Sequence, residues 1–330
     1  MSFPQRDGQD IARRLYSALV LPLTDQLQID EAGFRQLIRY YLAQPFAEQG
    51  GLIVNPEAGE VFYLTREEKR RVLEIALEET NGRMPVLAGA FGWTTEEAVE
   101  LAAEAKAMCA DGLFVIPPAG SMDISLAWDP IRYPEVWLDQ LKAQDRAANL
   151  PMFTHPVTSR TDPWGIGLPL ETTLKFCNEI PNIVGWKMTY AYPGHRILAR
   201  AMREQAPHVA LLCSSAHFFH EYLSVGNFDG TISGSWNYAL EPMLEHITAC
   251  RNGDFAAARK IWDNGLAQLH EYIYAEPGRL HVRYKIAAWL RGLIASPRMR
   301  PPMPNPRREE IERISQLMQR AGLPVIENVE

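Results

Sequence analysis

Short apolar runs and amphipathic stretches alternate along the first three quarters of the chain. The runs are continuously apolar, which is typical of parallel strands buried on both faces. The stretches between them repeat apolar residues at helical spacing. Eight strands are expected over residues 17–24, 50–55, 84–90, 112–117, 150–155, 183–189, 209–214 and 230–235. A helix is expected after each strand, beginning near residues 30, 65, 94, 133, 169, 194, 218 and 240.

Eight strand–helix units in a row predict an α/β fold, a (β/α)₈ TIM barrel. An open doubly wound sheet is the alternative, but the sequence has no Gly-x-Gly-x-x-Gly phosphate loop. From residue 254 the pattern changes to helices only, over residues 255–274, 281–293 and 306–321. We therefore expect a barrel domain over residues 1–253 and a C-terminal three-helix extension over residues 254–330.

Composition narrows the class of protein further. The net charge of −7 over 330 residues argues against a nucleic-acid partner. The longest apolar runs are too short to span a bilayer, and the N-terminus has no hydrophobic signal region. The four cysteines form no close-spaced pair, which is typical of reduced thiols in a cytoplasmic protein. We expect a cytoplasmic protein with a small-molecule partner.

The expected sixth strand, Ile-Val-Gly-Trp-Lys-Met-Thr at residues 183–189, places a lysine inside an apolar run. Side chains alternate along a strand, so Gly185, Lys187 and Thr189 share one face. Burial would lower the pKa of Lys187 and give a neutral amine that can attack a carbonyl to form a Schiff base. Gly185 would leave room for a substrate. The alternative is a lysine that pairs with a carboxylate or reaches the rim.

Several motifs along the chain carry a resemblance to a known family. They are the first strand (residues 18–24), Gly59-Glu60 with the helix start at residues 64–68, Gly-Trp-Lys-Met-Thr (185–189), Gly-Thr-Ile-Ser-Gly (230–234), and residues 287–293 with Met-Arg-Pro-Pro-Met (299–303). In this order and spacing the chain resembles the dihydrodipicolinate synthase / N-acetylneuraminate lyase family. The resemblance covers nearly the whole chain.

The resemblance implies a class I lyase or aldolase that acts on pyruvate or another 2-oxo acid. Lys187 would form the Schiff base, with no metal or organic cofactor. Ile232, Ser233 and Gly234 would line the substrate pocket. Glu60, with Gly59, would orient the site from behind the substrate-binding residues. The family usually forms homotetramers built from two dimers, so a homotetramer is expected.

The sequence also departs from the family pattern. Glu57 and Ala58 stand where two hydroxyl residues bind the substrate carboxylate. Phe153 stands where a tyrosine relays protons, and residues 117–120 lack the tyrosines of the fourth-strand loop. We therefore expect a divergent member with an altered pocket rather than an authentic dihydrodipicolinate synthase.

Two residues are candidates to replace lost functions. His155 lies two residues after Phe153, on the same strand face, and could carry protons near neutral pH. Its alternative is a structural hydrogen bond to a loop carbonyl. Arg160 could hold a substrate carboxylate with two parallel hydrogen bonds. Its alternative is a structural salt bridge.

Two other functions stay open from the sequence. A family member without the relay could act as a ligand-binding or regulatory protein. A metal-dependent lyase could use His217 and His220, joined by Cys213 and His155, because Zn²⁺ catalysis needs three convergent ligands. The Schiff-base enzyme is the function that we predict.

Overall fold

The computed structural model describes residues 6–118 and 128–326, and its eight parallel strands close into a barrel. This confirms the predicted fold. The order around the barrel is β1, β10, β9, β8, β5, β4, β3, β2. The strands are β1 (Leu15–Ala18), β2 (Gly50–Val54), β3 (Val86–Gly89), β4 (Gly112–Val115), β5 (Met152–Thr154), β8 (Ile183–Met188), β9 (Ala210–Cys213) and β10 (Gly230–Ser233).

Two further strands, β6 (Val157–Thr161) and β7 (Gly165–Gly167), form a separate antiparallel hairpin directly after β5. The sequence pattern did not predict this hairpin. Because of it, the lysine strand, which is sixth in the barrel, carries the label β8. The fourth-strand loop at residues 117–120, where the family's tyrosines are missing, lies partly outside the described residues.

Helices follow the strands as the amphipathic stretches predict. The α-helices are α1 (Gly8–Ala12), α2 (Glu31–Ala43), α3 (Phe46–Gln49), α4 (Arg66–Thr80), α5 (Thr95–Ala107), α6 (Glu135–Ala148), α7 (Leu170–Glu179), α8 (Tyr192–Gln205), α9 (Phe219–Ser224), α10 (Trp236–Arg251), α11 (Phe255–Ile261), α12 (Ala267–Tyr274), α13 (Leu280–Leu290) and α14 (Arg308–Arg320). Short 3₁₀ turns are η1 (Glu57–Gly59), η2 (Val61–Tyr63), η5 (Ala216–Phe218) and η7 (Pro277–Arg279), and Trp262–Leu266 forms a π turn.

Contacts divide the chain into two compact units, which we describe separately. The first comprises Met1–Tyr16, Pro85–Ser215 and Asn227–Ile232, and the second Ser17–Met84, Ala216–Gly226 and Ser233–Glu330. The C-terminal helices expected after the barrel are present. The domain boundary at residues 253 and 254 stays a prediction.

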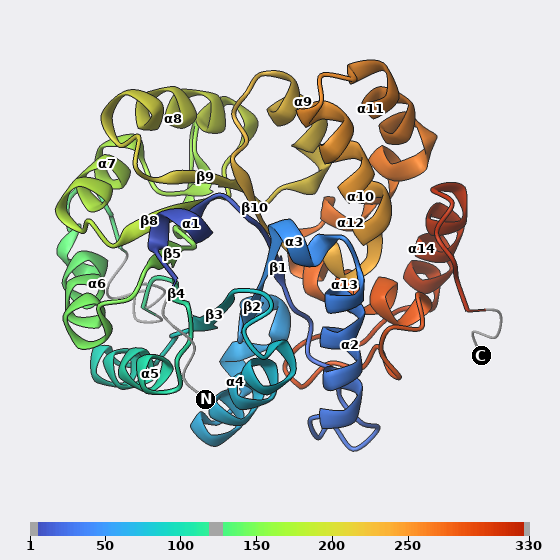
Figure 1. Ribbon diagram of the computed structural model, residues 1–330, viewed down its shortest axis with the longest axis horizontal. Helices are drawn as coiled ribbons and strands as arrows, with labels where there is room; N and C mark the ends of the chain where they lie inside the picture. Colours follow the sequence, from blue (N-terminus) through green and yellow to red (C-terminus); the bar gives the residue numbers. More distant parts are fainter. Residues whose placement is uncertain (1–5, 119–127, 327–330) are drawn as a thin grey trace. The chain divides into compact units, whose positions relative to one another are not determined.

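In the first unit, helices α5 to α8 cover the outer side of the strands (Figure 1). Trp137 of α6 packs against Phe176 of α7 and Trp186 of β8, with ring centroids 5.6 and 6.5 Å away. Trp186 therefore points outward into the helix layer. Since neighbouring strand residues alternate, Lys187 points the other way, to the barrel interior.

In the second unit, side-chain hydrogen bonds to the backbone mark where a helix begins and where a strand ends. Thr65 accepts a hydrogen bond from the backbone of Glu68, whose side chain accepts one from the backbone of Thr65, so the predicted capping box is formed. The first strand ends at Ala18 rather than continuing to residue 24. Asn237 explains this correction, because its side chain bonds the Ala18 carbonyl and the Val20 N–H.

The predicted continuous helix over residues 255–274 is wrong. It is divided into α11 and α12 by the π turn, in which Gly265 has a φ of 103°. A side chain is disfavoured at that φ, and a Cβ there would lie 2.9 Å from the backbone of Ala321. Glycine therefore allows the chain to widen here and begin a second helix.

Candidate active site

Lys187 and His155 meet inside the first unit, at the carboxyl ends of the neighbouring strands β8 and β5. The Nζ atom of Lys187 lies 3.2 Å from Nδ1 of His155. Lys187 is half-buried and His155 is 6% exposed. The carboxyl ends of barrel strands are where TIM-barrel enzymes carry their catalytic groups.

Strand register explains why these two side chains meet. Phe153 of β5 and Gly185 of β8 are register partners. His155 and Lys187 each lie two residues further along, on the same strand face. The backbone N–H of His155 donates to the Val115 carbonyl at 2.7 Å, so His155 remains aligned with β4 as well. Both nitrogen atoms are thus held at the same level of the barrel.

Phe114 of β4 supplies an apolar wall for this pair. Its ring centroid lies 5.7 Å from the Lys187 Nζ and 6.0 Å from the imidazole of His155, on which it stacks with an interplanar angle of 26°. Phe114 was not among the predicted site residues, although it is the register partner of Phe153. The ring therefore limits the access of water to the Lys187 side chain on this side.

The room expected beside Gly185 for a substrate is filled by protein, which corrects the prediction. A Cβ at this position would lie 2.6 Å from a ring carbon of Phe153 and 2.6 Å from Cδ1 of Leu212. Phe153 is fully buried and its ring meets Tyr16 edge-on at 5.1 Å. Gly185 and Phe153 therefore form a packed layer one step below Lys187 and His155.

In the second unit, Glu60 lies between the turns η1 and η2 in the left-handed region, with a φ of 62°. Its Oε1 accepts a hydrogen bond from Lys285 Nζ at 2.6 Å, and its Oε2 accepts one from the backbone N–H of Arg300 at 2.7 Å. Burial lowers the pKa of Lys285 and Glu60 opposes that effect. The carboxylate fixes the turn that carries Glu57, Ala58 and Gly59.

The carboxyl end of β10 carries a hydroxyl cluster in the second unit. Ser233 Oγ lies 2.7 Å from Ser235 Oγ and 2.9 Å from the hydroxyl of Tyr274. A Cβ on Gly234 would lie 2.3 Å from the ring of Tyr284, so glycine here allows that ring to pack. Ile232 is fully buried.

Arg160 is exposed on β6, in the hairpin that begins two residues after His155. The hydroxyl of Tyr190, which follows the lysine strand, is buried and accepts a hydrogen bond from the indole of Trp186 at 3.0 Å. Burial raises the pKa of Tyr190. Tyr190 therefore supports the outer face of β8.

Comparisons with known proteins give a consistent result. The sequence profile of the "Dihydrodipicolinate synthetase family" matches residues 12–120 and 139–321. A curated relative from Methanopyrus kandleri, named 4-hydroxy-tetrahydrodipicolinate synthase, is 31% identical over 93% of this chain and 95% of its own length. One from Protochlamydia amoebophila with the same name is 30% identical over 79% of this chain and 80% of its own.

This chain belongs to the dihydrodipicolinate synthetase family. Its fold matches that of dihydrodipicolinate synthase from Aquifex aeolicus, with a TM-score of 0.78, 23% identity, and coverage of 95% of this chain and 99% of the other. A prophage protein of E. coli K12 in the same family, solved in complex with pyruvate, matches with a TM-score of 0.78 and 22% identity over 94% and 98% of the two chains. The chain is thus an enzyme of the lyase class.

The identities of about 30% agree with a divergent family member. The sequence predicted only helices at Lys285, which pairs with Glu60, and at Tyr274 and Tyr284, which pack beside Ser233 and Gly234. Lys285 had no local signal, since Arg283 stands only two residues before it in the same stretch. Within the described part of the chain, no helix is long and apolar enough to cross a membrane.

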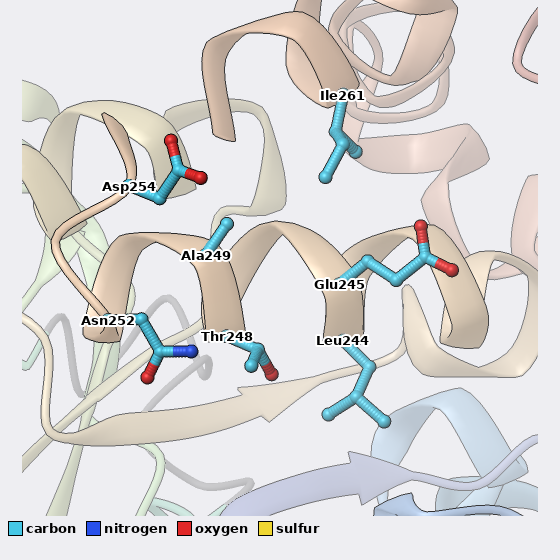
Figure 2. A pocket seen from close by; sticks show the side chains of 7 residues that line it. All are labelled: Leu244, Glu245, Thr248, Ala249, Asn252, Asp254 and Ile261. Carbon is cyan, nitrogen blue, oxygen red and sulfur yellow. The ribbon is translucent and has the colours of Figure 1, made fainter. Parts of the chain in front are cut away.

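A groove of about 540 Å³ lies elsewhere in the second unit, along α10 and α11 (Figure 2). No residue of the predicted active site lines this groove. Its lining residues are Leu244, Glu245, Thr248, Ala249, Asn252, Asp254 and Ile261. Asp254 caps the start of α11 by accepting a hydrogen bond from the backbone of Ala257, so this carboxylate has a structural role.

Proposed function

We propose that this enzyme is a class I lyase or aldolase, or a dehydratase, which forms a Schiff base between Lys187 and pyruvate or another 2-oxo acid. The observation that carries the proposal is the 3.2 Å separation between Lys187 Nζ and His155 Nδ1. At this distance the amine can pass a proton directly to the imidazole. Catalysis by an amine requires such a proton carrier beside the nucleophile.

The chemistry uses the two nitrogen atoms in turn. His155 Nδ1 accepts a proton from the Lys187 ammonium, and the neutral amine attacks the ketone to form a carbinolamine. The imidazolium then returns a proton to the carbinolamine hydroxyl, which leaves as water. The resulting protonated imine withdraws electrons from the substrate. It permits cleavage or formation of the C3–C4 bond, or loss of water across C3 and C4.

Substrate contacts follow from the resemblance and stay predictions. Arg160 would bind the carboxylate, since its guanidinium can donate two parallel hydrogen bonds. Glu57 and Ala58 occupy the family's carboxylate-binding positions, and Ile232, Ser233 and Gly234 its pocket floor. A glutamate and an alanine bind a carboxylate poorly, which supports a substrate different from that of the synthases.

Borohydride trapping tests the proposal. The full-length protein is incubated with pyruvate and sodium borohydride, and the adduct is located by intact-mass and peptide mass spectrometry. Pyruvate is the first probe because a structural neighbour was solved with it. We expect one pyruvate-sized adduct on Lys187. It should be absent in Lys187→Ala and retained in Lys175→Ala, a matched control for exposed lysines in the same unit.

A panel of longer 2-oxo acids extends the test. An adduct with one of them identifies the substrate class even when pyruvate gives none. Absence of any adduct across the panel, with the protein folded, overturns the enzyme mechanism in favour of a ligand-binding protein. We also expect a homotetramer in solution, measured by light scattering, and a cytoplasmic location.

A further inference from the structure

Three potential metal ligands converge in the second unit, and none of them takes part in the proposed chemistry. His220 Nδ1 lies 3.0 Å from His246 Nε2, and His246 Nε2 lies 4.0 Å from Cys250 Sγ. All three atoms lie within 4.8 Å of one another. Among the residues that the structure describes, no other group of three or more His, Cys, Asp or Glu side chains has this spacing.

Helix geometry builds the cluster. His246 and Cys250 are four residues apart on α10, so their side chains lie on the same helix face. His220 comes from α9, which packs against α10 (Figure 1). His217, which the sequence paired with His220, is not part of the group; its ring instead contacts Tyr274 at 5.1 Å. The His-x-x-His spacing therefore pointed to the wrong partner.

Trp262 covers two of the three ligands. Its ring stacks on His220 at 5.8 Å with an interplanar angle of 18°, and lies 5.1 Å from the ring of His246. Trp262 is the first residue of the π turn, and such turns occur frequently at functional sites. The widened turn thus places an apolar cover over the imidazoles.

The cluster is buried on one side and reaches solvent on the other. His246 is 1% exposed and Cys250 is 7% exposed, while His220 is partly exposed and leaves a route to solvent.

We propose that His220, His246 and Cys250 bind one Zn²⁺ ion, with a fourth coordination position open to water. Two histidines and a cysteine match the nitrogen and sulfur ligands that Zn²⁺ takes. Tetrahedral Zn²⁺ would place two nitrogen ligands about 3.3 Å apart and a nitrogen and a sulfur about 3.6 Å apart. The His220–His246 distance of 3.0 Å and the His246–Cys250 distance of 4.0 Å lie within about 0.4 Å of these values, and the His220 and Cys250 ligand atoms lie within 4.8 Å of each other.

Binding of the ion releases one proton. Zn²⁺ displaces one proton from the Cys250 thiol and bonds the thiolate. Each imidazole keeps its proton on the ring nitrogen that faces away, so Nδ1 of His220 and Nε2 of His246 present lone pairs to the ion. The ion would connect α9 to α10.

The test uses full-length protein freed of metal by a chelator and then titrated with Zn²⁺ against a chromophoric competitor. We expect one Zn²⁺ per chain. Titration with Co²⁺ should give visible d–d bands of a tetrahedral site and a near-ultraviolet thiolate-to-cobalt band. Cys250→Ser and His246→Asn should weaken Zn²⁺ binding at least about tenfold, and Cys250→Ser should remove the thiolate band.

Control variants separate this site from other thiols and imidazoles. Cys109→Ser, at an exposed cysteine, and His217→Asn should keep both the affinity and the spectrum. Cys250→His should keep Zn²⁺ but lose the thiolate band, which covers the case in which Cys250→Ser fails to fold. The proposal is overturned if wild-type protein binds no stoichiometric Zn²⁺, or if the affinity is unchanged in folded Cys250→Ser and His246→Asn. It does not depend on the Schiff base, because trapping on Lys187 and metal binding are measured separately.

Discussion

The ammonium of Lys285 donates a hydrogen bond to Oε1 of Glu60 at 2.6 Å, and neither side chain is more than 1% exposed. Two charges removed from water in this way depend on each other. Breaking a buried pair leaves one uncompensated charge, which costs about 3–5 kcal/mol, whereas replacing both charges can be nearly neutral.

We therefore expect Lys285→Met to lower the free energy of unfolding by about 3–5 kcal/mol. The double variant Glu60→Gln with Lys285→Met should recover much of this loss, because no unpaired charge remains. Urea unfolding measures both. Arg259→Met is the control, since it breaks an exposed pair with Asp263 and should change stability little. A double variant no more stable than the single one would contradict the account.

His155→Phe should slow formation of the Lys187 imine by about 10²–10⁴-fold, the range that a positioned proton carrier supplies. Quenched borohydride reduction at successive times gives the rate constant, with whichever 2-oxo acid forms the adduct. Phenylalanine can still stack on Phe114, so the wall beside Lys187 is kept.

His208→Gln is the matched control for this variant. His208 belongs to the same unit, but its Nε2 donates to the Cys177 carbonyl at 3.2 Å and serves the protein backbone. We expect its rate of imine formation to equal that of the wild type. A His155→Phe protein that reacts at the wild-type rate would show that His155 carries no proton in this step.

Gly185→Ala should destabilise the protein by about 1–3 kcal/mol, the usual cost of overpacking a core. The new methyl group would lie 2.6 Å from atoms of Phe153 and Leu212. Adding Phe153→Leu should restore part of the loss by removing ring atoms. Gly278→Ala is the control, because a Cβ there has no atom within 4 Å. Equal midpoints for Gly185→Ala and Gly278→Ala in urea would refute the packed layer.

His195 on α8 should make stability depend on pH. It is fully buried, and burial lowers its pKa from 6.5 to about 4. Between pH 6.5 and about pH 4, His195 binds a proton in the unfolded chain but stays neutral in the folded protein. Stability is therefore complete above pH 6.5 and is lost as the pH falls toward about 4, with a slope approaching ~1.4 kcal/mol per pH unit.

Urea unfolding of wild type and His195→Phe between pH 7 and pH 5 measures this contribution. The variant is expected to have the shallower slope, whatever its stability at pH 7. Parallel pH curves for the two proteins would mean that His195 takes up its proton while folded.

Local sequence patterns predicted the structure correctly where neighbouring residues determine it. The hydroxyl of Thr65 and the carboxylate of Glu68 satisfy helix-start donors, so α4 begins where the sequence says. Alternation along 183–189 correctly separated Trp186 from Lys187. The same alternation put Phe153 and His155 on one face, which led to the histidine beside the lysine.

Features that depend on distant partners were not predictable in this way. The space beside Gly185 is filled by Phe153, a residue 32 positions earlier, so no local pattern shows it. His220 has a ligand spacing with His217 in sequence, yet its ring nitrogen meets His246 because helix packing decides the contact. The π turn at Gly265 also escaped notice, since a single glycine within a helical pattern is usually tolerated.

The pairing of Phe153 with Gly185 has a consequence for the chemistry above it. A strand can shift along its neighbour without reversing its faces only in steps of two residues, about 7 Å. Such a shift would bring the Phe153 ring against a residue with a side chain and leave a void at Gly185. The large Phe153 and the small Gly185 therefore pack together in only one alignment of β5 and β8. The packing of these two residues thus determines which imidazole reaches the amine.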